Sequence, residues 1–232
     1  MKWGTDLPLT DYAVIWDLDG TLVDTAELHF QAWLDLSRQL GKPFSRADFA
    51  ATFGRRNPEI IHRLLGNEFN EQELADLGDR KENLYRAAAE VGVELLPGAR
   101  PLLEGLAAAR FRQAIGSSAP RKNVELILRL TKTERFFAAV VAMEDTQRGK
   151  PDPQVFQLAA SRLGVAPAHC VVIEDAIAGV QAAKAGGMRC VAVTFVGHHD
   201  DAALKAAGAE LVVKSLDDLS VEAVRQLCFR AM

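Results

Sequence analysis

Two aspartates, Asp17 and Asp19, stand two residues apart at the end of a short apolar run, residues 13–16. If the run is a straight strand, side chains at this spacing point to the same face. Gly20 follows directly and permits a sharp turn. Two carboxylates at the end of a buried strand are costly unless a cation or hydrogen bonds compensate them. The pattern therefore indicates either a cation site or an acidic turn.

Three later apolar runs are also followed by polar residues, which are Ser117-Ser118, Lys150 and Glu174-Asp175. Clustered carboxylates suit Mg²⁺, which keeps phosphate oxygens and waters as its other ligands. A serine hydroxyl and the backbone N–H groups around it can hold phosphate oxygens, and a lysine adds a fixed positive charge. Together these residue types predict a site for a metal and a phosphate.

Each of these residues also has an ordinary structural explanation when it is considered alone. Asp19 could form a turn, Ser117 could cap a helix that begins near Pro120, and Lys150 could be a solvated surface charge. The acids, the hydroxyl and the lysine nevertheless occur in order, each at a strand end or in the loop beyond it. Because the carboxyl ends of parallel strands meet at one edge of a sheet, the combination favours a common site.

The elements that would position these residues follow a clear order. Strand-like and helix-like runs alternate over residues 93–213, which predicts a parallel sheet covered by helices on both faces. Residues 25–92 show helical patterns throughout, beginning with a capping box from Asp24 to Glu27. We therefore expect the α/β class, a doubly wound parallel sheet with an inserted all-helical cap domain. The core would comprise residues 1–24 and 93–232, and the cap residues 25–92.

The composition excludes several other classes of protein. The chain has 232 residues, 49% of them hydrophobic, and a formal net charge of −4, which argues against a nucleic-acid partner. The N-terminus lacks the apolar segment of a signal peptide, and no apolar run is long enough to span a bilayer. Its three cysteines show no metal-binding or disulfide spacing. We expect a cytoplasmic protein, without membrane partner, that is a monomer or a weak homo-oligomer.

With these motifs in hand, the chain resembles the haloacid dehalogenase (HAD) superfamily of phosphotransferases. The segment 17–21 resembles the nucleophile motif of that superfamily, Ser117 its second motif, Lys150 its third and Glu174-Asp175 its fourth. The segments 24–33 and 80–85 resemble the branch that holds β-phosphoglucomutase and its sugar-phosphatase relatives. The resemblance implies a Rossmann-like core with a helical cap of the C1 type.

The resemblance also implies a mechanism. Asp17 would attack phosphorus and form an aspartyl-phosphate, while Ser117, Ser118 and Lys150 would hold the phosphoryl oxygens. The cofactor would be Mg²⁺, held by Asp17, the backbone carbonyl of Asp19, and Glu174 and Asp175. Asp19 would protonate the leaving alkoxide and then activate water, so we expect its surroundings to raise its pKa.

Two residues of the predicted cap are candidates for substrate contact because of their spacing. His29 and Trp33 stand four residues apart on the first cap helix and therefore share one face. In the mutase branch, the histidine that matches His29 takes part in gating the catalytic acid, and the lysine that matches Lys81 contacts substrate. We carry these roles over as expectations.

One position departs from the mutase branch. That branch has a cap arginine where an ungapped alignment places Asn57 in this chain, and Arg55 or Arg56 could replace it. A mutase must grip a second phosphate on the cap side, so the departure favours a phosphatase acting on a small phosphorylated metabolite such as a sugar phosphate. The alternatives are a β-phosphoglucomutase-like hexose phosphomutase and a receiver-type signalling module, which needs neither a cap nor an acid at Asp19.

Overall fold

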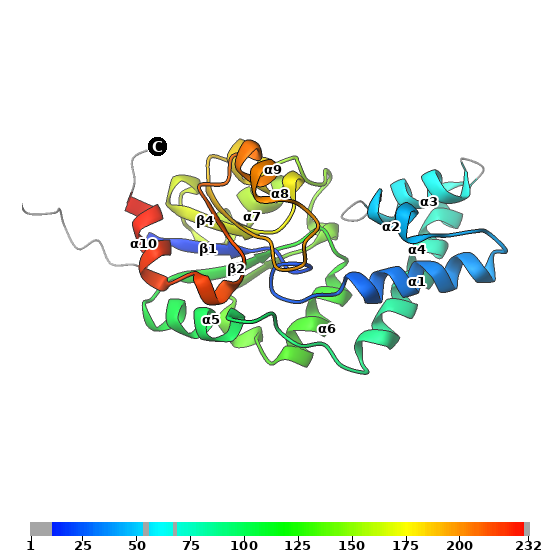
Figure 1. Cartoon of the computed structure of the whole chain (residues 1–232), viewed down its shortest axis with the longest axis horizontal. Coiled ribbons are helices and arrows are strands. Elements are labelled where there is room, and N and C mark those ends of the chain that lie inside the picture. The colour runs from blue at the N-terminus through cyan, green and yellow to red at the C-terminus, as the bar shows by residue number, and fades with distance from the viewer. Residues whose placement is uncertain (1–10, 53–55, 67–68, 230–232) are drawn as a thin grey trace, which may run out of the picture.

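The computed structural model describes residues 11–52, 56–66 and 69–229 of the chain. These residues form a six-stranded parallel sheet with the strand order β3-β2-β1-β4-β5-β6 (Figure 1). The strands are β1 (Ala13–Trp16), β2 (Arg112–Gly116), β3 (Ala139–Val141), β4 (Cys170–Glu174), β5 (Arg189–Val193) and β6 (Leu211–Val213). The predicted fold class is confirmed, and β1 lies at the centre of the sheet, between β2 and β4.

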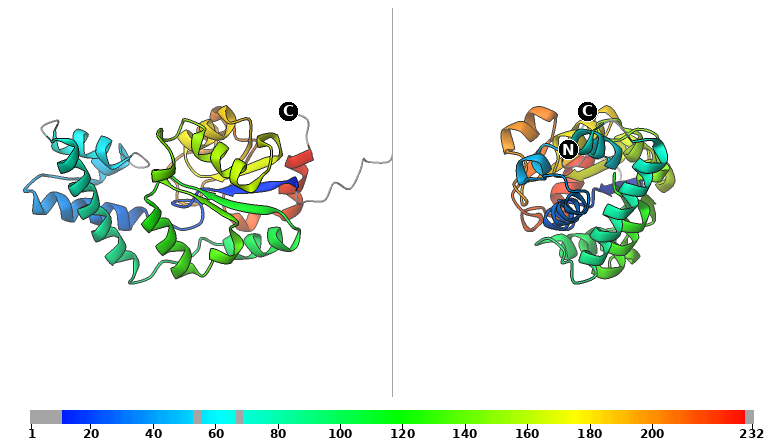
Figure 2. Two further views of the ribbon diagram at one scale, coloured as in Figure 1. Left: turned by 180° about the vertical axis from the view of Figure 1, so that it is seen from behind. Right: turned by 90° about the vertical axis from the view of Figure 1, so that its right-hand side faces the viewer.

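Helices cover both faces of the sheet (Figures 1 and 2). One face carries α5 (Ala99–Ala108), α6 (Arg121–Thr131) and α10 (Val221–Phe229); the other carries α7 (Gln154–Leu163), α8 (Ile177–Ala185) and α9 (Asp201–Ala207). Successive residues of β1 enter the two apolar cores in turn: Val14 packs in the first and Ile15 in the second. Both faces of β1 are therefore buried, which explains its unbroken apolar sequence.

The helices α1 (Ala26–Gln39), α2 (Arg46–Ala50), α3 (Asn57–Leu65) and α4 (Glu71–Ala89) lie beyond the carboxyl ends of the strands (Figures 1 and 2). They share a separate apolar cluster, in which Phe30 and Trp33 of α1 contact residues of α3 and α4. The second half of α4 differs, because Tyr85 and Ala89 pack into the core on one face of the sheet. Thus α4 spans both parts of the molecule.

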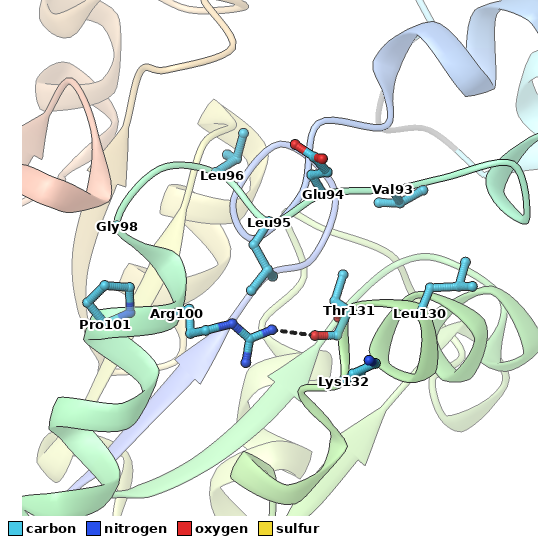
Figure 3. A pocket seen from close by; sticks show the side chains of 10 residues that line it. All are labelled: Val93, Glu94, Leu95, Leu96, Gly98, Arg100, Pro101, Leu130, Thr131 and Lys132. Atoms are coloured by element: carbon cyan, nitrogen blue, oxygen red, sulfur yellow. Dashed lines mark hydrogen bonds between the residues drawn. The ribbon is translucent and has the colours of Figure 1, made fainter.

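The chain enters and leaves this helical group through two segments that lie side by side. Val23 and Leu95 form an isolated antiparallel bridge, and the Leu96 amide donates to the carbonyl of Leu22 at 2.8 Å. A shallow hollow of about 430 Å³ lies between the returning segment, α5 and the end of α6 (Figure 3). Arg100 and Lys132 line it, and none of the predicted site residues does.

Local structure departs from the sequence-based predictions in two places. The capping box expected from Asp24 to Glu27 is absent: Thr25 is the N-cap residue of α1, and its hydroxyl donates to Asp19. Helix α9 was not expected, because only Leu204 of its residues is buried and gives no apolar periodicity. Single turns of 3-10 helix lie at Glu134–Phe136, Met143–Asp145, Pro167–His169 and Leu216–Asp218. Among the described helices, none is long and apolar enough to cross a membrane.

Candidate active site

The predicted nucleophile, Asp17, lies immediately after β1 and is held there by the neighbouring strand. Its amide donates to the carbonyl of Ile173 in β4 at 2.9 Å. One carboxylate oxygen accepts from Lys150 Nζ at 2.5 Å, and the same ammonium group donates to Glu174 Oε1 at 2.8 Å. All three side chains are almost completely buried. Residues far apart in the sequence therefore meet at the edge where the strands end, as predicted.

Asp17, Glu174 and Asp175 together offer carboxylate oxygens that lie within 4.8 Å of one another. The Glu174 carboxylate is fixed by the amides of Asp175 and Ala176, at 2.7 and 2.5 Å. Within the described ranges, Asp175 Oδ2 is buried and accepts no hydrogen bond. A buried carboxylate oxygen without a donor is costly, and a divalent cation would satisfy it.

Two glycines leave room for this cluster of carboxylates. A methyl group on Gly20 would overlap the Asp175 carboxylate, and one on Gly179 would overlap Glu174. Gly20 also adopts a positive φ of +89°, a conformation that side chains rarely allow. The turn after β1 is therefore built to bring the backbone close to the acids.

The electrostatics of the cluster follow from its burial. Burial raises the pKa of Asp17 to about 7, although the charge of Lys150 opposes the change. Burial and the negative charges of Glu174 and Asp17 raise the pKa of Asp175 well above its usual value. Burial alone would lower the pKa of Lys150, but the two carboxylates outweigh it and raise that pKa. A single ammonium group thus faces three carboxyl groups, and an added cation would favour their ionised forms.

The predicted acid, Asp19, lies in a different environment. Its Oδ1 accepts from the Thr25 hydroxyl and lies 3.7 Å from His29 Nε2. Burial raises its pKa, but the contacts with His29 and Thr25 and the charge of Lys81 lower it further than burial raises it. The expectation of a raised pKa is therefore wrong for the ligand-free chain: the sequence did not show that α1 and α4 would place donors and a cation around Asp19.

The predicted phosphate-binding serines follow β2. The Ser117 amide donates to the carbonyl of Val141, and the Ser117 hydroxyl accepts from the Ala119 amide, both at 3.0 Å. The turn that results leads directly into α6. Ser117 and Ser118 line the same cavity as Asp17 and Lys150. The serine segment therefore lies beside the acids and the lysine, as the sequence predicted.

This cavity has a volume of about 730 Å³ and lies between the strand ends and the helical group. All the predicted site residues that the structure describes line it: they are Asp17, Asp19, His29, Trp33, Arg56, Lys81, Ser117, Ser118, Lys150, Glu174 and Asp175. The size is typical of a pocket for a small molecule. Asn57, which stands at the position of the mutase arginine, lines it as well.

The cations on the helical side of the cavity are held by protein groups. Arg56 donates to the Thr146 hydroxyl at 2.9 Å and to the Gln147 carbonyl at 3.2 Å, in the loop that leads to Lys150. Lys81 Nζ lies 2.9 Å from Glu82 Oε1 and 2.7 Å from His29 Nδ1. Arg55, the other candidate for the mutase arginine, lies outside the described residues.

Several residues near the site were not predicted. Thr25, which contacts Asp19, was interpreted as part of a helix start, and Glu82 belongs to a charged run that suggests a solvated face. His198 and His199 line the cavity from the loop between β5 and α9. The position of Glu82 directly after the candidate substrate residue Lys81 was the signal in the sequence that could have indicated a polar network there.

Comparison with known proteins agrees with this geometry. The family model of haloacid dehalogenase-like hydrolases matches residues 13–187. The chain is 34% identical over 221 residues to a β-phosphoglucomutase of Bacillus subtilis, covering 92% of this chain and 94% of that one. It is 33% identical over 216 residues to a phosphorylated carbohydrates phosphatase of Thermotoga maritima, covering 90% and 97%.

A solved β-phosphoglucomutase from Clostridium difficile superposes with a TM-score of 0.84 at 28% identity, covering 94% of this chain and 96% of that one. The chain therefore belongs to the haloacid dehalogenase-like hydrolases and is an enzyme. The family and the fold were both expected from the four motifs.

Proposed function

We propose that the chain is a Mg²⁺-dependent phosphatase that hydrolyses a small phosphorylated metabolite, a sugar phosphate, through an aspartyl-phosphate on Asp17. The observation that carries the proposal is the contact of Lys150 with both Asp17 and Glu174 at the floor of the 730 Å³ cavity. A carboxylate nucleophile beside a fixed cation suits attack on an anionic phosphoryl group. The sugar-phosphate class is suggested by the names of the Bacillus and Thermotoga relatives.

The acids fit the metal that the family typically uses. Asp17, Glu174 and Asp175, with the backbone carbonyl of Asp19, would hold Mg²⁺, and the unpaired Asp175 Oδ2 supplies an oxygen without another partner in the described chain. When bound, Mg²⁺ would neutralise charge on the nucleophile and on the phosphoryl group. All the proposed side-chain donors are carboxylates, which Mg²⁺ prefers over nitrogen or sulfur.

The protein groups divide the reaction into two steps. In the first, an Asp17 oxygen bonds to phosphorus, the bond from phosphorus to the sugar oxygen breaks, and Asp19 donates a proton to that oxygen. In the second, Asp19 takes a proton from water, the water oxygen bonds to phosphorus, and the Asp17–phosphorus bond breaks to release phosphate. Ser117 and Lys150 hold the phosphoryl oxygens throughout. The ionised Asp19 of the free chain gains a proton when the phosphate dianion binds, because a nearby like charge raises its pKa.

The helices α1–α4 form the cap in this proposal, and the residues 1–24 and 93–232 the catalytic core. The paired linkers at Val23 and Leu95 lie where a hinge would allow the cap to open. A closed cap excludes water until the substrate has bound and sets the specificity. His29, Trp33 and Lys81 would then face the sugar from the cap side.

The alternative is a hexose phosphomutase, in which a sugar hydroxyl replaces water in the second step. It is supported by the similarity to β-phosphoglucomutase. The geometry favours the phosphatase. Among the described residues, one lysine and one arginine line the cavity from the cap, and both form hydrogen bonds with protein groups. Arg56 contacts Thr146 and Gln147, and Lys81 contacts Glu82, so neither is presented for a second phosphate.

The experiment is a phosphate-release assay over a panel of sugar phosphates with Mg²⁺. We expect release from several members of the panel, no release in EDTA, and loss of release in the Asp17→Asn variant. Negligible release, with conversion of glucose 1-phosphate to glucose 6-phosphate once a hexose bisphosphate is added, would overturn the phosphatase in favour of the mutase.

A further inference from the structure

A buried glutamate on α4, Glu82, accepts hydrogen bonds from three side chains of different elements. Lys81 Nζ lies 2.9 Å from Glu82 Oε1, and Asn57 of α3 donates to the same oxygen at 2.8 Å. Asn123 of α6 donates to the other oxygen at 2.6 Å. Glu82 is only 4% exposed. A buried carboxylate is tolerated only with such complete pairing.

Asn123 is held from its other side as well. Its amide oxygen accepts from Arg86 at 2.7 Å, and Arg86 lies one turn beyond Glu82 on α4. Glu82 and Arg86 therefore hold both ends of a single amide, which itself is 1% exposed. We call this arrangement the Asn123 clamp. It joins a helix of the proposed cap to the first turn of α6, the helix that follows the phosphate-binding serines Ser117 and Ser118.

The other side of Glu82 leads to the acid. Lys81 Nζ lies 2.7 Å from His29 Nδ1. An ammonium group can only donate, so a charged Lys81 makes Nδ1 the acceptor and leaves the ring proton on Nε2, which faces Asp19. The His29 ring is further held by stacking on Tyr85, with ring centroids 4.2 Å apart. The orientation of the histidine toward Asp19 thus depends on Lys81 staying charged.

Lys81 is 2% exposed, and burial lowers its pKa, while the Glu82 carboxylate raises it. We propose that Glu82 is a positioning residue of the reaction: anchored by Asn123 and Asn57, it holds Lys81 and His29 against the acid Asp19. Through Asn123, Glu82 also connects the acid Asp19 to the helix that follows the phosphate-binding serines. The acid and these serines are therefore both in place only when the cap lies against the core. This inference rests on the proposed function.

The test compares two substrates that differ in their need for an acid. Glucose 6-phosphate, or the fastest sugar phosphate of the panel, leaves as an alkoxide and requires protonation; 4-nitrophenyl phosphate leaves as a stable phenolate and does not. For Glu82→Gln we expect the rate of the first step on the sugar phosphate, measured in a single turnover as release of the sugar, to fall about 10-fold or more, a part of what a general acid contributes. On 4-nitrophenyl phosphate we expect the release of 4-nitrophenolate in the same measurement to fall less than about 3-fold, because the second step, in which Asp19 acts on water for both substrates, is not measured. Equal losses on both substrates would overturn the inference.

A matched control is available on the same helix pair. Glu90, at the end of α4, contacts Arg129 of α6 at 2.6 Å, but both side chains are about half exposed. Glu90→Gln removes the same charge from the same pair of helices without touching the acid, so it should leave both rates unchanged. An equal effect of Glu90→Gln and Glu82→Gln would contradict the positioning role.

A second variant protects the test against misfolding. Asn123→Ala removes the clamp but leaves Glu82 paired with Lys81 and Asn57. Its rate on the sugar phosphate should again fall more than its rate on 4-nitrophenyl phosphate. If the wild type hydrolyses neither substrate, the proposed function fails. Amide hydrogen exchange then tests separately whether the Asn123 clamp holds α4 to α6. Faster exchange at the start of α6 in Glu82→Gln than in Glu90→Gln would support the clamp, and equal exchange would overturn it.

Discussion

Replacement of Lys150 by methionine tests whether this lysine is the internal counter-ion of the acids. The side chain of Lys150 is 8% exposed, and its ammonium group lies 2.5 Å from Asp17 and 2.8 Å from Glu174. At an effective dielectric constant of about 20, each contact is worth roughly 6 kcal/mol of attraction. The variant Lys150→Met keeps most of the length of the side chain and removes only the charge.

The net loss in the free energy of unfolding is smaller than this attraction, because the variant no longer buries an ammonium group. Breaking one partner of a buried ion pair costs about 3–5 kcal/mol, since the remaining charges are left without compensation. We therefore expect Lys150→Met to lower the free energy of unfolding by about 3–5 kcal/mol in EDTA. We also expect Mg²⁺ to reduce the difference in the free energy of unfolding between the variant and the wild type, because a bound cation compensates part of the charge of the carboxylates.

The assay is urea unfolding in EDTA and in Mg²⁺, followed by tryptophan fluorescence. Lys184→Met is the matched control: Lys184 pairs with Glu210 near the surface, where its side chain is 35% exposed, so its loss should cost below about 1 kcal/mol. If Lys150→Met in EDTA costs no more than Lys184→Met, Lys150 does not compensate the acids and the electrostatic account of the site is wrong.

Four further predictions concern the metal, the acids that would bind it and the cap. Gly20→Ala should weaken Mg²⁺ binding, seen as a smaller thermal shift on adding Mg²⁺, because a methyl group overlaps the Asp175 carboxylate; an unchanged shift would contradict the site. In the wild type, that shift should shrink as the pH falls from about 8 to about 6, because protons compete for Asp17, whose pKa is raised to about 7. In EDTA, the raised pKa of Asp17 should make the wild type lose stability relative to Asp17→Asn as the pH rises from about 4 to 7, and a difference between the two proteins that does not change over this range would refute it. Arg56→Ala should raise the KM for sugar phosphates about 10-fold by loosening the cap from the Lys150 loop, and an unchanged KM would show that this contact does not act in closure.

The sequence was sufficient for the parts of the molecule that depend on local pattern and on the rules of parallel sheets. The apolar runs ending in Asp17, Ser117 and Glu174 had to be buried strands, and parallel strands bring their carboxyl ends to one edge. The metal and phosphate residues could therefore be placed together without coordinates. Each of these residues stands next to an element that the sequence shows clearly.

The parts that could not be predicted depend on contacts between elements far apart in the chain. The sequence around Thr25 does not show that its hydroxyl donates to Asp19 instead of capping α1. This contact helps to lower the pKa of Asp19, which was expected to be raised. Likewise Glu82 lies in a charged run of α4, and its burial follows only from the packing of Asn57 and Asn123 around it. In both cases tertiary packing, and not local sequence propensity, determines the environment of the side chain.

The central claim is that Asp17 carries the phosphoryl group, and trapping the intermediate tests it most directly. The enzyme is mixed with Mg²⁺ and the fastest sugar phosphate, quenched in acid, reduced with borohydride, and digested for mass spectrometry. Reduction converts an aspartyl-phosphate to homoserine, so we expect homoserine at position 17 in the wild type and none in Asp17→Asn. Homoserine at another aspartate, or turnover that persists in Asp17→Asn, would contradict the account.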